Sequence, residues 1–191
     1  MSSATDEMPG YLPGIWAIDP ARSGLTFSVG HLGVHTVHGT LSVSGRIVMA
    51  EDPLDSAVDA TIDLGSVNTG SKGRDEAIRS AHLLDVSSRP TATYRSQRLD
   101  LAEPPGEFLL HGDLELLGVT REVPMRIRLQ RSTSGGSHQP VITAAGEFTR
   151  RDFGLMYQAR PRFLDRAISS SVGVKVRLEA ASAAATEGIG R

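Results

Sequence analysis

Apolar and polar residues alternate with a period of two through most of the chain between residues 15 and 179. Such alternation is typical of β-strands that bury one face and expose the other. Its clearest apolar members are Leu25, Phe27 and Val29; Leu41, Val43 and Ile47; Val58, Ala60 and Ile62; Val123, Met125, Ile127 and Leu129; and Val172, Val174, Val176 and Leu178. Parallel strands buried on both faces would read as continuous apolar runs, so the pattern predicts antiparallel strands.

The segments between these strands carry turn residues rather than long helical crossovers. Pro- and Gly-containing turn signals occur at 52–53, 104–106 and 134–136 and indicate hairpins. One internal helix is predicted over 74–84, because Asp75 and Glu76 in its first turn complement the helix dipole. A second short helix is expected within 151–169.

About eight strands with one apolar face each must either stack as two sheets or close into a barrel, and the alternation leaves both open. The 191 residues are enough for one domain with a substantial core. We expect mobile segments at 1–12 and 181–191 and a single domain over 13–180.

Charge and composition narrow the class of partner. The formal charge of −2 gives no overall attraction for nucleic acid, and we expect none to bind. No apolar run approaches the length of a membrane helix, and the first residues lack the pattern of a signal peptide. We therefore predict a cytoplasmic protein without stable membrane insertion. The absence of cysteine excludes thiol catalysis and cysteine-ligated metals.

Three histidines, His31, His35 and His38, lie close together among glycines and valines. They would share one face of a helix, but the neighbouring glycines and β-branched residues disfavour a helix. In an extended strand His31 and His35 share a face and His38 points the other way, so at most two could bind one metal. The histidines are therefore expected at a strand and turn. The alternative is a metal-dependent enzyme that uses His31, His35, His111 or His138 with a carboxylate such as Asp152.

Other catalytic motifs are incomplete. The tripeptide Asp152-Phe153-Gly154 has no accompanying Gly-rich phosphate loop or kinase catalytic loop. The serines at 169–171 lack the sequence of a nucleophile elbow. These segments therefore give little support to a kinase or an acyl-transfer enzyme.

Several longer motifs follow one another in a specific order. The first is WAIDPARSGLTFSVGHLGVHTVHGTLSVSGRI, followed by SVNTGSKGRDEAIRS and RPTATYRS, then GDLELLGVTREV and RRDFGL. In this order, from residue 16 to residue 179, they resemble the YceI-like family. The chain departs from the family pattern at Ala77-Ile78, where His-Leu is expected, and at Leu83-Leu84, where paired Phe is usual. These changes bear on the shape of a ligand more than on the fold.

The resemblance implies an all-β protein, an antiparallel lipocalin-like eight-stranded β-barrel with one or two short helices, and frequent homodimers. It also implies that the barrel interior binds a long apolar molecule such as a polyisoprenoid, an isoprenoid quinone or a fatty-chain lipid. Only 5% of the residues are aromatic, so few large rings are available to fill the lumen. We predict non-enzymatic binding, without a cofactor, for storage, shielding or transport of the ligand.

The strand alternation assigns side chains to the lumen of such a barrel. The predicted lining is Phe27, Val29, Leu41, Val43, Phe108, Leu110, Val123, Met125, Ile127, Phe148, Val172 and Val174. The predicted partners of a polar head group are His31, Arg74, Arg79, Arg150 and Arg151. Two alternatives stay open: the arginines form local pairs with Asp75 and Asp152, or the protein is a structural dimer whose lumen is filled by side chains.

Overall fold

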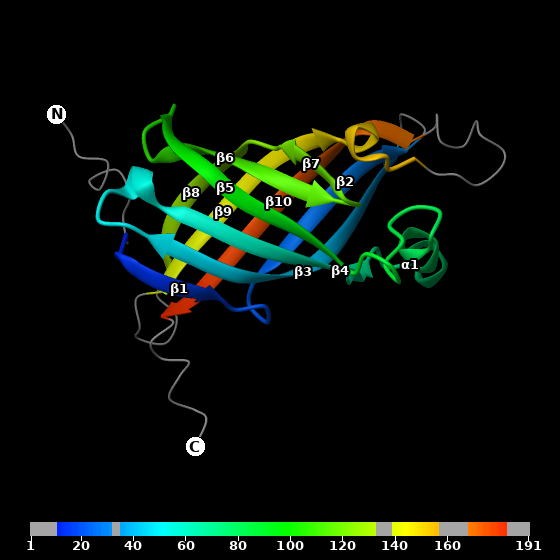
Figure 1. Cartoon of the computed structure of the whole chain (residues 1–191), viewed down its shortest axis with the longest axis horizontal. Coiled ribbons are helices and arrows are strands. Elements are labelled where there is room, and N and C mark those ends of the chain that lie inside the picture. The colour runs from blue at the N-terminus through cyan, green and yellow to red at the C-terminus, as the bar shows by residue number, and fades with distance from the viewer. Residues whose placement is uncertain (1–10, 32–34, 133–138, 157–167, 183–191) are drawn as a thin grey trace, which may run out of the picture.

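The structure is a computed structural model that describes residues 11–31, 35–132, 139–156 and 168–182 (Figure 1). Its strands are β1 Gly14–Ile18, β2 Gly24–His31, β3 His35–Met49, β4 Ala57–Asn68, β5 Thr91–Ala102, β6 Glu107–Leu116, β7 Val119–Glu122, β8 Met125–Ser132, β9 Gln139–Thr149 and β10 Ile168–Ser182. They are accompanied by the helix α1 Lys72–Arg79 and by two 3-10 turns, η2 Pro53–Asp55 and η4 Arg150–Phe153.

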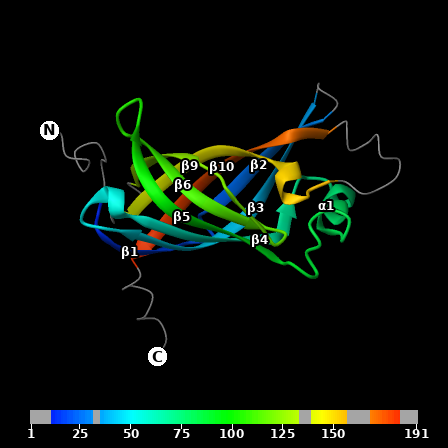
Figure 2. The same cartoon turned by 45° about the horizontal axis from the view of Figure 1, so that its top comes forward.

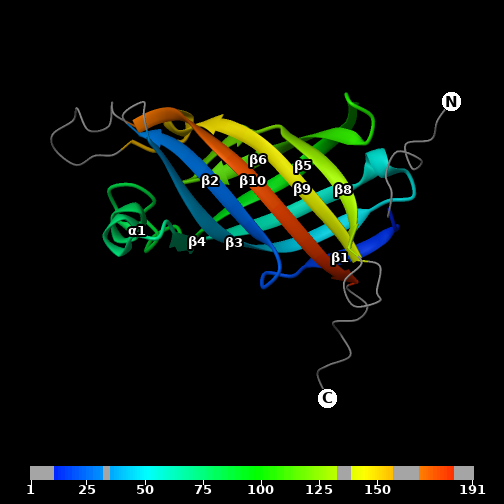
Figure 3. The same cartoon turned by 180° about the vertical axis from the view of Figure 1, so that it is seen from behind.

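The strands form one closed antiparallel barrel. β10 pairs with β2 on one side and with β9 on the other, which joins the two ends of the sheet. β1 and β2 both pair with β3 and with β10, so together they occupy one strand position of the barrel. β7 and β8 both pair with β6 and share another position. The ten strands therefore make eight strand positions, here called rows. Figure 3 shows β10 running between β2 and β9 along the barrel. The predicted eight-stranded antiparallel barrel is confirmed, and the two-sheet alternative is excluded.

The two ends of the barrel differ. At one end, called the mouth end, β4 leads into α1 and β9 leads into η4. Figure 2 shows α1 lying beyond the strand ends there. At the opposite end, called the floor end, η2 joins β3 to β4 and β1 begins. Buried apolar side chains fill this end, among them Trp16, Ile18, Ile47, Met49, Leu99, Phe108 and Leu129.

Residues at the start of the described chain take part in the fold. Tyr11 lies within the segment predicted to be mobile, yet its side chain packs on the core. Its hydroxyl group donates a hydrogen bond to the Ala50 carbonyl at 2.6 Å. The indole N–H of Trp16 donates to the Leu12 carbonyl at 3.0 Å. These bonds fix the chain where it enters the floor end.

The helix α1 ends earlier than the sequence predicts, at Arg79 rather than at residue 84. Ser80 has an extended conformation with ψ 161°, and Asp85 has a positive φ of 47°. The intervening turn places Leu83 and Leu84 against the barrel interior. In the region of the second predicted helix, residues 150–153 form η4, while 157–167 lie outside the described residues.

The outer wall of the barrel is polar, as the alternation predicts. Asp59, which points away from the lumen, forms ion pairs with Arg46 at 3.2 Å and with Arg95 at 3.6 Å. Its strand neighbours Val58 and Ala60 face inward. Across the described ranges, no helix combines the length and apolar character needed to cross a bilayer.

Candidate ligand-binding cavity

A cavity of about 610 Å³ lies inside the barrel, and its lining is almost entirely apolar. Eleven of the twelve predicted lumen residues line it: Phe27, Val29, Leu41, Val43, Leu110, Val123, Met125, Ile127, Phe148, Val172 and Val174. The placement predicted for these side chains is therefore right, while their contact with a ligand remains a prediction. The cavity also excludes the alternative of a lumen filled by side chains.

Phe108 is the predicted lumen residue that does not line the cavity. Its side chain points inward but has no exposed surface, because it is packed within the floor end. The alternation identifies the inward face of a strand, but it does not give the level at which neighbouring side chains close the interior. The assignment of Phe108 to the lining was wrong for this reason.

Several lining residues were not predicted. Ile78 of α1 and Leu83 and Leu84 of the following turn cover the mouth end of the cavity. Tyr94 of β5 lines the wall, two residues after the inward-facing Ala92. The period of two in β5 could have identified Tyr94, whereas the early end of α1 hid the role of the two leucines.

The hydroxyl of Tyr94 is hydrogen-bonded within the wall. It donates to the carbonyl of Val123 at 3.0 Å and also lies 3.3 Å from the carbonyl of Leu110. Burial raises the pKa of the Tyr94 phenol, and the nearby acidic groups Glu122 and Asp113 add to this effect. Tyr94 is therefore neutral at ordinary pH and adds no charge to the wall of the cavity.

The histidines follow the strand geometry that the sequence predicts. His31 at the end of β2 lines the cavity. His35 is its cross-strand neighbour at the start of β3, and His38 pairs with Ser28, whose side chain faces outward. Both His35 and His38 are exposed. His31 thus brings a polar ring to the mouth of an otherwise apolar cavity.

Arg74 and Asp75 connect the start of α1 with the end of β4. Arg74 lines the cavity and donates to the hydroxyl and carbonyl oxygens of Thr69, both at 2.8 Å. The buried carboxylate of Asp75 accepts from the N–H of Thr69 at 2.9 Å and from its hydroxyl at 2.5 Å. The hydroxyl bond lowers the pKa of Asp75 against the opposing effect of burial. Asp75 therefore stays ionised and holds α1 in place.

Arg79 lies away from the cavity lining. Its guanidinium donates to the carbonyls of Gly65 at 3.0 Å and Val67 at 2.9 Å, so it joins the last turn of α1 to β4. Arg74 and Arg79 therefore both join α1 to β4, and only Arg74 also reaches the lumen. The alternative pairing of Arg74 with Asp75 takes an indirect form, because both side chains bond to Thr69.

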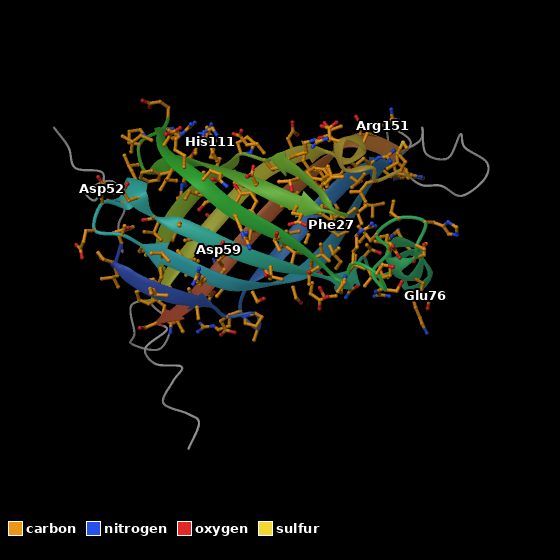
Figure 4. All side chains as sticks on the ribbon, viewed as in Figure 1. Phe27, Asp52, Asp59, Glu76, His111 and Arg151 are labelled. Atoms are coloured by element: carbon orange, nitrogen blue, oxygen red, sulfur yellow. The ribbon has the colours of Figure 1, made fainter. Side chains whose placement is uncertain are left out.

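Arg150 and Arg151 differ in exposure. Arg150 lines the cavity and is only 4% exposed, and its guanidinium donates to the carbonyls of Leu155 at 2.5 Å, Ser169 at 2.8 Å and Ile168 at 3.2 Å. It thereby connects η4 to the beginning of β10. Arg151 is exposed on η4, and Figure 4 shows it at the mouth end, with Asp52 at the opposite end.

The residues of the metal-enzyme alternative are spread over the molecule. His111 lies on the outer face of β6, where its ring nitrogens are 2.7 Å from Glu122 and 3.3 Å from Asp100. Asp152 is in η4, and His138 lies outside the described residues. Among the residues whose positions are described, no group of three or more His, Asp or Glu side chains has the arrangement of a metal site.

These features define a lipocalin-like β-barrel protein with an internal apolar cavity. The YceI-like domain matches residues 16–180. The chain belongs to the YceI-like family, as its motifs predicted.

Relatives of similar length support this assignment. The UPF0312 protein of Serratia proteamaculans is 30% identical over 159 residues, which cover 80% of this chain and 81% of the relative. Protein YceI of Salmonella arizonae is 30% identical over 141 residues, which cover 72% and 73% of the two chains.

Two solved structures show the same fold at lower identity. BcnA of Burkholderia cenocepacia superimposes with a TM-score of 0.71 at 17% identity, over 86% of this chain and 99% of that chain. A polyisoprenoid binding domain from Saccharophagus degradans, implicated in plant cell wall breakdown, gives a TM-score of 0.66 at 22% identity, over 87% and 98%.

Proposed function

We propose that this protein binds a long-chain apolar ligand in the barrel lumen and catalyses no reaction. The ligand class is a polyisoprenoid, an isoprenoid quinone or a related lipid. The observation that carries the proposal is the cavity of about 610 Å³, whose wall is almost entirely apolar. The polyisoprenoid binding domain with the same fold supports the ligand class.

The distribution of polar residues in the cavity determines the orientation of the bound ligand. Its basic lining residues, His31, Arg74 and Arg150, come from the mouth end, and the deeper wall is formed by aliphatic and aromatic side chains. A ligand with a polar head therefore enters with its apolar tail first. At roughly 0.8 kcal/mol per buried methylene, about ten methylenes would supply micromolar affinity before ordering costs.

Enclosure of the tail suits storage, shielding or transport, since each needs an apolar chain kept away from water. The proposal also includes the homodimer that the family resemblance implies and a cytoplasmic location. Light scattering of the purified protein tests the first, and cell fractionation tests the second.

Native mass spectrometry of the protein as purified, followed by organic extraction, tests ligand binding directly. We expect one isoprenoid or fatty-chain molecule per subunit. Protein that carries no organic molecule, and that takes up neither added polyprenol nor added quinone, would overturn the proposal.

The head-group end can be tested with two histidine variants from one hairpin. His31→Leu removes a ring that lines the cavity, whereas His38→Leu, the matched control, changes an exposed ring on the outer face. We expect His31→Leu to weaken binding of an isoprenyl phosphate, and to leave binding of the corresponding hydrocarbon unchanged. Equal effects of both variants would show that His31 is not a head-group contact.

A further inference from the structure

The cavity ends before the barrel does. On β6 its lining begins at Leu110, and the next inward side chain toward the floor end, Phe108, lies outside it. Phe108 is 0% exposed, and Ile47, Leu99 and Leu129 of the floor end are also buried. A ligand tail that reaches Leu110 therefore meets a packed floor.

The ring of Phe108 is adjacent to the cavity wall. Phe108 is the cross-strand partner of Ile127, which pairs with Ala144, which in turn pairs with Val176. Ile127, Ala144 and Val176 all line the cavity. Phe108 thus occupies the position at which this row of inward side chains passes from the wall into the floor.

The size of the cavity sets a limit on what fits above this floor. Along β10 the lining runs from Ile168 to Leu178, or about 25 Å along the barrel axis for a strand tilted by about 40°. The stretch of an extended tail that can lie above the floor is therefore limited to about this length.

We propose that the lumen is a closed-ended ruler that selects the length of the isoprenoid tail, with Phe108 as the residue that sets this length. The inference rests on the proposed function. A shorter tail leaves wall atoms without contacts, and a longer tail keeps its additional units at the mouth, where they gain little from burial. Affinity should therefore rise with chain length and then level off.

The test measures the affinity of the wild-type protein for linear prenols of about two to ten isoprene units, where burial of each added unit strengthens binding. We expect at least a tenfold gain for each unit until the tail fills the space above the floor, and less than about a threefold change beyond that length. Affinity that continues to rise without a break would overturn the ruler. Failure of every prenol to bind would instead overturn the proposed function.

Two variants move the floor in opposite directions. Phe108→Ala removes a ring of six carbons from the floor, about the size of one five-carbon isoprene unit, and should lengthen by about one unit the tail at which affinity levels off. Ala144→Phe adds a ring of the same size to the wall and should shorten that tail by about one unit.

A matched control separates the floor from a general effect of ring removal. Phe153→Ala deletes an equally buried ring, 1% exposed, from η4 at the mouth end, and Phe153 does not line the cavity. In this variant the affinity should level off at the same prenol length as in the wild-type protein. If Phe108→Ala fails to fold, the shift in Ala144→Phe decides, and an unmoved break in that variant overturns the proposal.

Discussion

The ring of Tyr94 on β5 lies directly against Gly112 on β6, two residues from Leu114, the cross-strand partner of Tyr94. A Cβ atom at Gly112 would collide with the ring carbon that carries the Tyr94 hydroxyl. Because this space is empty, the ring crosses β6 and its hydroxyl reaches the carbonyl of Val123, where the chain passes from β7 to β8. The glycine thus allows a tyrosine to hold together two short strands that share one row.

Gly112→Ala should lower the free energy of unfolding by about 1 to 3 kcal/mol, because the added methyl group displaces the ring. Tyr94→Phe should cost about 1 kcal/mol, since it removes the hydrogen bond to Val123. Urea denaturation measures both. In a Tyr94→Leu background the alanine substitution should cost clearly less, and strictly additive effects would show that the two residues are not coupled.

Acid should destabilise the protein through Asp75 and Glu107. Hydrogen bonds from Thr69 and from Arg126 lower the pKa of these carboxyls below their usual values of 3.8 and 4.5. Their contribution to stability is therefore complete above the unfolded-state pKa and is lost as the pH falls through the folded-state pKa, because the unfolded chain then binds more protons.

We expect Asp75→Asn and Glu107→Gln each to reduce stability at neutral pH and to flatten its loss in acid. Urea unfolding at a series of pH values between about 3 and 7 gives the slope. Arg126→Gln, which removes the donor to Glu107, should flatten it as well. A slope unchanged in all three variants would place the acid sensitivity elsewhere.

Removal of a bound lipid should lower the melting temperature. A ligand at about 100 times its Kd stabilises the folded state by about 2.7 kcal/mol, and extraction removes this contribution. Scanning calorimetry before extraction, after extraction and after refilling with polyprenol provides the measurement. A melting temperature that is unaffected by extraction, despite a confirmed loss of lipid, would mean that the lipid does not bind preferentially to the folded barrel.

Chelation should leave the stability unchanged. His31 and His35 lie at the mouth end and His111 on the outer wall of β6, so they do not converge on one point. We expect dialysis against EDTA to shift the melting temperature by less than about 1 °C, because metal that stabilises the fold would be linked to its unfolding. Stoichiometric metal in untagged protein, together with a large drop in the melting temperature after chelation, would support the metal-dependent alternative.

The inward residues of the strands were predictable because a half-buried strand repeats every two residues. Val172 and Val174 line the lumen for this reason. Closure of the barrel was not contained in the same signal, since pairing of β10 with β2 joins segments from opposite ends of the chain. The order of the family motifs supplied that information instead.

The mouth was harder to predict because its residues serve the local fold as well as the cavity. Arg79 resembled an anion-binding residue by its position on a helix, yet its guanidinium bonds to the carbonyls of Gly65 and Val67. The same contacts accompany the early end of α1, which brings Leu83 and Leu84 to the lumen. The positions of Arg79 and of the two leucines depend on backbone carbonyls of β4, which cannot be inferred from the sequence of α1.

The shared rows of β1 with β2 and of β7 with β8 also affect self-association. Across the described part of the chain, each strand of the closed path has a hydrogen-bonded neighbour on both sides, and the short strand β7 is paired on one side, with β6. Exposed strand edges are the usual template for joining sheets of separate molecules and for aggregation. Copies of this barrel can therefore meet through side chains of their outer walls or along the four-residue edge of β7, and continuation of the sheet elsewhere would require a pair of strands to separate first.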